Sequence, residues 1–210
     1  MMTERIQKTL SFLKASFEGF SDPYRYEHSI RVAHIGAEIA RREGLDEEAF
    51  IIACLLHDIA YSAPHPDNYD WYEHGRDGAK IARPFLQSLG LSTEQIEEIC
   101  YGIAIHVDDK ADFPGRRTVF ALSVSDADNI DRFDMLRLYF SLYNADFQNL
   151  SHSERLDWLA SSISRLESFR DFGFATETGK AMWLDKIEFQ LSFQNRLLSQ
   201  LKSSIIPEEF

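Results

Sequence analysis

Cysteine is scarce in this sequence. Cys54 and Cys100 are the two cysteines of a 210-residue chain, and each lies in an apolar stretch. Small secreted domains are stabilised by many disulfides, and two isolated cysteines do not provide such a framework. We therefore expect both to be reduced core residues of an intracellular protein.

Long apolar runs are also missing. The opening segment, MMTERIQKTLSFLKASF, mixes charged with apolar residues and lacks the apolar centre of a signal peptide. No other apolar stretch approaches the length that crosses a bilayer. These features predict a soluble, cytoplasmic protein with no membrane partner.

Positive charge is in short supply. Lys and Arg total 22 against 34 Asp and Glu, so the formal net charge is −12. An acidic chain without a basic stripe is a poor partner for nucleic acid, which attracts proteins through its phosphates. Bound cations would neutralise part of this negative charge if some carboxylates are metal ligands.

Strand patterns are absent and helical periodicity is present nearly everywhere, which predicts an all-α, single-domain bundle over residues 1–210. Gly44 is placed to end one helix and Asp46 to cap the next. Ser92 with Gln95, and Ser151 with Glu154, have capping-box spacing. Residues 61–73 contain two prolines and are expected to form a loop at the rim of a site. The helices are expected at about 3–18, 25–43, 46–60, 74–89, 93–107, 117–146, 153–170 and 178–203.

Four histidines lie on helix faces that are otherwise apolar: His28, His57, His74 and His106. Each position predicts a side chain that points into the protein. One buried imidazole is commonly a satisfied core residue, but four of them together with a buried carboxylate favour a metal site. Neutral imidazole and carboxylate are natural ligands for zinc, iron or manganese.

His57 and Asp58 are adjacent, which restricts where they can lie. Neighbours on a helix point about 100° apart, so both reach one ion only from near a helix end. The apolar run AFIIACLL stops at this point and Tyr-Ser-Ala-Pro follows. Asp58 is therefore placed to direct its two oxygens to different ions.

The run YRYEHSIRVAHIGAEIARREGLDEEAFIIACLLHDIAYS, with VSDADNIDRF further on, resembles the HD superfamily of metal-dependent phosphohydrolases. The family pattern matches His28, His57, Asp58 and a later aspartate. The helical phase leaves Asp126 and Asp128 open as that aspartate, and the Ala-Asp spacing of the family favours Asp128. The resemblance covers roughly residues 24–135, and a C-terminal helical extension is expected at about 150–210.

The resemblance extends to His74 and His106, which match the extra histidines of the subgroups that bind two metals. It implies one ion held by His28, His57, Asp58 and Asp128, and a second held by Asp58, His74 and His106. One or two divalent ions (Fe, Mn or Zn) are the expected cofactors. Asp58 is the residue expected to act in catalysis, since it would contact both ions.

The implied reaction is hydrolysis of a phosphoester or phosphoanhydride bond in a small nucleotide-like substrate by a metal-activated water. Arg31, Arg76 and Lys80 are the cations expected to bind its phosphate. A di-iron oxygenase on the same scaffold and a non-catalytic nucleotide-binding module are the alternatives. Trp183, Phe189 and Phe193 offer an aromatic face through which a homodimer could form.

Overall fold

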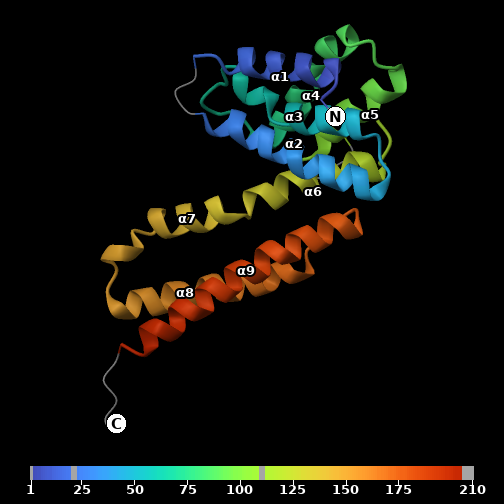
Figure 1. The fold of residues 1–210 in the computed structure, drawn as a ribbon. Coiled ribbons are helices and arrows are strands. Elements are labelled where there is room, and N and C mark those ends of the chain that lie inside the picture. Colours follow the sequence, from blue (N-terminus) through green and yellow to red (C-terminus); the bar gives the residue numbers. More distant parts are fainter. Residues whose placement is uncertain (1, 20–22, 109–111, 205–210) are drawn as a thin grey trace. The chain divides into compact units, whose positions relative to one another are not determined.

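A computed structural model describes residues 2–19, 23–108 and 112–204. The predicted all-α class is confirmed, because the described residues contain α-helices and short 3-10 turns but no strand (Figure 1). Within these residues no helix is both long and apolar enough to cross a membrane. The α-helices are α1 (Glu4–Ser16), α2 (Tyr24–Glu43), α3 (Glu47–Leu56), α4 (His74–Ser88), α5 (Thr93–Ile105), α6 (Val119–Arg132), α7 (Met135–Asn144), α8 (His152–Ser168) and α9 (Glu177–Lys202).

The predicted helix boundaries rest on caps that the structure contains. Gly44 follows α2 with a φ of 70°, a left-handed conformation that favours glycine. The Asp46 side chain accepts a hydrogen bond from the Ala49 amide at 3.1 Å and so begins α3. Both predicted capping boxes are present, at Ser92 with Gln95 and at Ser151 with Glu154.

The prediction of a single helix over 117–146 is wrong. It breaks into α6 and α7 because Asp134 adopts an extended backbone, with φ −85° and ψ −165°. Its side chain accepts a hydrogen bond from the Met135 amide at 2.7 Å, so it caps a new helix. The apolar periodicity continues across this break, which is why periodicity alone did not reveal it.

The helix expected over 46–60 is also shorter than predicted. α3 ends at Leu56, and a 3-10 turn, η1 (Ile59–Ser62), follows. Between them Asp58 leaves the helical conformation, with φ −100° and ψ 15°. The end of α3 therefore lies at the His57-Asp58 pair, as the geometry of adjacent ligands requires.

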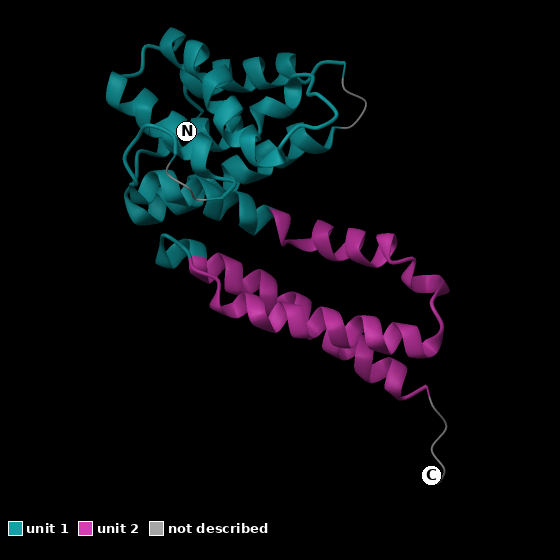
Figure 2. Ribbon diagram, turned by 180° about the vertical axis from the view of Figure 1, so that it is seen from behind, with its two compact units in different colours: residues 1–131, 174–179 teal, residues 132–173, 180–210 magenta. Residues whose placement is uncertain are grey.

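The described chain divides into two compact units (Figure 2). The first comprises residues 1–131 and 174–179 and includes α1 to α6. Its central element is α3, which packs against α1, α2 and α5 and is buried from Ile52 to Leu56. A Cβ at Gly36 of α2 would lie 2.5 Å from the Cys54 Sγ, so this close contact between α2 and α3 requires glycine.

The second unit comprises residues 132–173 and 180–210. Trp183 lies buried against Phe133 and Phe169, and its indole N–H donates to the Phe169 carbonyl at 2.7 Å. Phe189 and Phe193 are exposed. Trp183 is thus a core residue and is unavailable to a partner, whereas homodimer formation through the other two aromatics stays a prediction. The single domain over residues 1–210, with its core at about 24–135, also stays a prediction.

Candidate metal centre

The four histidines meet inside the first unit from four different helices. His57 directly follows α3 and His106 directly follows α5, while His74 begins α4. His28 lies in the first half of α2. All four side chains are buried, as their apolar helix faces predicted.

Each histidine has one ring nitrogen held by a hydrogen bond. Nδ1 of His57 donates to the Cys54 carbonyl and Nδ1 of His106 to the Ile103 carbonyl, both at 2.7 Å. Nδ1 of His74 donates likewise to the Trp71 carbonyl. Carbonyls at helix ends have no intrahelical partner, so they are available to fix these rings. His28 instead uses the carboxylate of Asp131.

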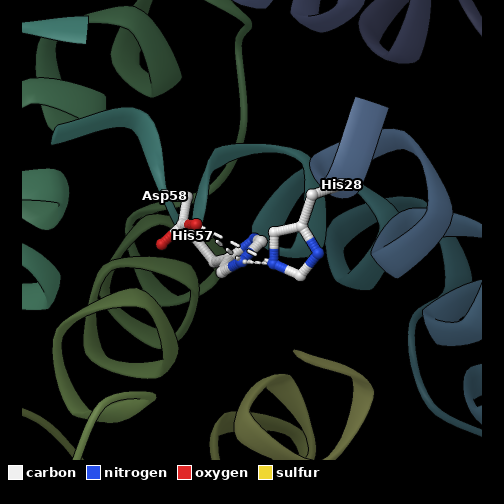
Figure 3. Close-up of side chains that lie close together, drawn as sticks. All are labelled: His28, His57 and Asp58. Atoms are coloured by element: carbon white, nitrogen blue, oxygen red, sulfur yellow. Dashed lines mark hydrogen bonds and ion pairs between the residues drawn. The ribbon is translucent and has the colours of Figure 1, made fainter. Parts of the chain in front are cut away.

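The other ring nitrogens face each other in two pairs. Nε2 of His28 lies 3.2 Å from Nε2 of His57, the first histidine pair, and Figure 3 shows these rings converging beside Asp58. Nε2 of His74 lies 3.2 Å from Nε2 of His106, the second histidine pair. In neutral rings whose Nδ1 donates, both facing Nε2 atoms carry lone pairs. Such a pair needs a proton or a metal ion to be stable.

A close approach of α4 to α5 creates the second histidine pair. A Cβ at Gly75 would lie 2.7 Å from the Ala104 carbonyl oxygen, so the residue after His74 must be glycine for these helices to pack this tightly. The sequence His74-Gly75 therefore combines a ligand with the contact that positions it.

Asp58 lies between the two pairs and directs one oxygen to each. Its Oδ2 lies 3.8 Å from Nε2 of His28 and 3.6 Å from Nε2 of His57. Its Oδ1 lies 3.4 Å from Nε2 of His74 and 3.6 Å from Nε2 of His106. Each pair together with Asp58 forms a group compact enough to hold an ion.

The structure places Asp128, not Asp126, at this cluster. Oδ1 of Asp128 lies 3.0 Å from Nε2 of His28 and 3.8 Å from Nε2 of His57. Oδ2 of Asp126 accepts a hydrogen bond from the Ala175 amide at 2.9 Å instead. The geometry therefore favours Asp128 as the later ligand.

One histidine in each pair attracts a proton. Burial opposes a charge on His28, but hydrogen bonds to Asp128 and Asp131 raise its pKa to about 9. Burial likewise opposes a charge on His106, and its hydrogen bond with Asp58 raises its pKa. The cluster therefore stabilises positive charge at the two places where the Nε2 atoms face each other.

Burial and neighbouring groups also shift the pKa values of His57, Asp58 and Asp128. Burial lowers the pKa of His57 to about 4, which keeps this ring neutral. Burial opposes the charge of Asp58, but the surrounding imidazoles, through the hydrogen bonds of the second histidine pair among others, hold its pKa well below the usual range. Asp128 is affected in the same way, and its hydrogen bond with His28 lowers its pKa to about 2 despite burial. Neutral imidazoles and ionised carboxylates are the forms that bind metals.

The donor set fits a divalent transition metal. Four imidazole Nε2 atoms and the oxygens of Asp58 and Asp128 are the ligand types that zinc, iron and manganese accept. Each imidazole is also fixed by a hydrogen bond at Nδ1, as is usual for histidines that bind metal.

The three cations expected to bind substrate have carboxylate partners. Arg31 donates from Nε and Nη2 to Asp131, at 2.7 and 3.1 Å. Arg76 is buried and donates to Asp112, to Asp108 and to the Tyr72 carbonyl. Lys80 is exposed and pairs with Asp77 at 2.9 Å. Their roles in substrate binding stay predictions, and these ion pairs compete with such roles.

Sequence reasoning missed Arg25 at this site. Its Nη1 donates to Oδ2 of Asp58 at 2.7 Å, and its guanidinium carbon lies 3.6 Å from the centroid of the Tyr61 ring. Arg25 precedes His28 by three residues and therefore shares its helix face. That spacing was the signal that could have identified it.

Comparisons with known proteins identify the fold and the family of the chain. A protein solved by crystallography and described as a predicted HD superfamily hydrolase, from an uncultured Thermotogales bacterium, is similar to this chain with a TM-score of 0.66 and 24% sequence identity. The similarity covers 93% of this chain and 92% of that one, which shows a shared fold. Residues 25–135, more than half of the chain, match the model of the HD domain. The chain therefore belongs to the HD domain family.

Proposed function

We propose that this protein is a metal-dependent phosphohydrolase that cleaves a phosphoester or phosphoanhydride bond. The observation that carries the proposal is the position of Asp58, whose two oxygens each face one pair of converging histidines. A carboxylate shared in this way suits two ions a few ångströms apart, the arrangement of many phosphatases.

The first ion would be held by the first histidine pair with Asp58 and Asp128, and the second by Asp58 and the second histidine pair. When bound, such ions provide a nucleophile by lowering the pKa of water, and they polarise the phosphoryl oxygens. Iron, manganese and zinc all suit these ligands.

The chain's own residues prepare the site. Hydrogen bonds at Nδ1 hold each Nε2 atom toward its partner, so no ring must rotate when an ion binds. The surrounding apolar core keeps Asp58 and the histidines nearly inaccessible to solvent. In such surroundings electrostatic interactions are stronger than in water.

Aromatic residues beside the site support a nucleotide-like substrate. The Tyr61 ring lies 4.9 Å from that of His74 and stacks on Trp71 at 5.3 Å. Trp71 is 53% exposed, although aromatic side chains of this size are usually well buried. An exposed stacked ring next to a phosphate site suits a nucleobase, since every base offers a flat face.

The experiment is a screen of metal-free protein with iron, manganese or zinc added back, against nucleotides and simple phosphoesters. We expect metal-dependent hydrolysis that Asp58→Asn abolishes. Asp157→Asn is the matched control, because Asp157 is an exposed residue of α8 in the other unit. Hydrolysis of none of these compounds by any loaded form would contradict the proposal. Oxygen consumption by an iron-loaded form would favour the oxygenase, and nucleotide binding without turnover the non-catalytic module.

A further inference from the structure

Arg25 contacts the candidate centre directly. Its side chain is 36% exposed, whereas that of Asp58, its hydrogen-bond partner, is 4% exposed. The guanidinium therefore connects the buried carboxylate to solvent. Arg25 is thus a partly exposed cation in direct contact with a buried carboxylate of the centre.

The hydrogen bond to Asp58 uses one of the N–H donors of Arg25. A guanidinium has five N–H donors in a rigid planar fork, and Nη1 provides one of them to Oδ2. A carboxylate oxygen accepts more than one partner, so Oδ2 can bind Arg25 and still face the first histidine pair. Arg25 thereby fixes the orientation of Asp58 and keeps further donors.

Tyr61 holds the guanidinium in place without using those donors. The guanidinium carbon lies 3.6 Å from the ring centroid, so the contact is made by its face. Stacking of this kind leaves the in-plane N–H groups able to bind a planar or tetrahedral anion. Tyr61 follows Asp58 by three residues in η1, so one short segment supplies both contacts of Arg25.

Arg25 also differs from the cations predicted from the sequence. Arg31 gives two donors to the single carboxylate of Asp131, and Arg76 is buried beside Asp112. The partner of Arg25 is instead a carboxylate of the centre itself. An anion at the centre would therefore lie within reach of Arg25 and need not break a remote ion pair.

We propose that Arg25 binds the anionic phosphoryl group of the substrate with its remaining donors while one donor positions Asp58, and that Tyr61 is its platform. This inference rests on the proposed phosphohydrolase function. Arg25 is then the residue that recognises the negative charge of the substrate. The 3-10 turn η1, which follows the metal ligand Asp58, contributes to this recognition through Tyr61.

The test uses inorganic phosphate as the probe and metal-loaded full-length protein, with metal content measured for every variant. We expect Arg25→Gln to weaken phosphate binding, measured by calorimetry, about 10- to 100-fold, because hydrogen bonds between charged groups are lost. Arg25→Lys keeps the charge but loses the fork, so an intermediate loss is expected. Arg83→Gln is the control, since Arg83 forms a comparable ion pair with Glu97 on the surface of the same unit.

A second pair of variants tests the platform. Tyr61→Phe keeps the ring and is expected to bind phosphate nearly as wild type does, whereas Tyr61→Leu is expected to bind several-fold more weakly. Equal binding by both variants would overturn the role of Tyr61. If Arg25→Gln fails to fold, the two Tyr61 variants still test the proposed binding of phosphate by Arg25.

The outcomes separate the inference from the function on which it rests. If wild-type protein binds and hydrolyses phosphate compounds and loaded Arg25→Gln binds phosphate equally tightly, the inference fails and the function stands. If loaded wild-type protein neither binds phosphate nor hydrolyses any phosphoester, the function fails and the inference with it.

Discussion

Oδ2 of Asp131 lies 2.6 Å from Nδ1 of His28, and this contact distinguishes His28 from the other histidines of the cluster. The others lie at helix ends and use free backbone carbonyls. His28 lies within α2, where the carbonyls are occupied by helical hydrogen bonds. A carboxylate from α6 provides the orienting partner instead.

Asp131→Asn should therefore weaken metal binding. The amide keeps a hydrogen bond to His28 but removes the negative charge that increases the basicity of the ring. We expect the metal affinity, measured by competition with a chelator, to fall about tenfold or more. Asp157→Asn should not change it. Equal affinities for Asp131→Asn and wild type would show that the contact does not tune the centre.

Asp126 and Asp128 should behave differently although they are two residues apart. Asp128→Asn should lose bound metal, because its Oδ1 faces the first histidine pair. Asp126→Asn should keep the metal and lower the free energy of unfolding by about 1–2 kcal/mol, since the Ala175 amide loses a charged acceptor. Metal analysis and denaturant unfolding of both variants check this, and the opposite assignment of losses would refute it.

The two proposed ion positions should differ in affinity. The first has Asp128 in addition to two histidines and Asp58, whereas the second has His74, His106 and Asp58 alone among the described residues. His74→Ala should therefore retain about one ion per chain, while Asp58→Ala should lose both because its carboxylate is shared. Metal content after gel filtration distinguishes these outcomes. Complete loss in His74→Ala would mean that the positions are not separable.

The buried thiols give a prediction for pH dependence. Burial raises the pKa of Cys100 to about 11 from 9.0 and raises that of Cys54 as well. An acid whose pKa is higher in the folded state contributes stability that is present below pH 9 and is lost as the pH rises toward 11. Urea unfolding should show this decline, and Cys100→Ala should reduce its steepness. A variant with the same slope as wild type would exclude the thiol as its source.

Much of the fold could be predicted from local signals. Apolar periodicity located the helices, and residues such as Gly44 and Asp46 marked their ends because caps act through neighbouring backbone groups. The break at Asp134 was missed because a capping aspartate interrupted a pattern that stayed apolar on both sides. The hydrogen bond from the Met135 amide to the Asp134 side chain determines where the new helix begins, and the apolar periodicity does not record it.

Some residues of the candidate site could be predicted from the sequence, whereas others could not. The histidines and Asp58 were identified because buried polar groups on apolar faces need a common partner. The carboxylates that pair with Arg31 and Arg76 lie 100 and 36 residues further along the chain, so sequence neighbours did not reveal them. Arg25 shares a helix face with His28, but its contacts with Asp58 and Tyr61 depend on the turn that follows α3, which the sequence did not reveal.

Metal analysis of wild-type protein prepared anaerobically and without chelators tests the central claim most directly. The account predicts about one to two transition-metal ions per chain, held by the two histidine pairs, Asp58 and Asp128. Asp58→Ala prepared in the same way should lose both metal and hydrolysis, and His57→Ala should lose hydrolysis together with the ion of the first position. Folded wild-type protein with no stoichiometric metal would contradict the account.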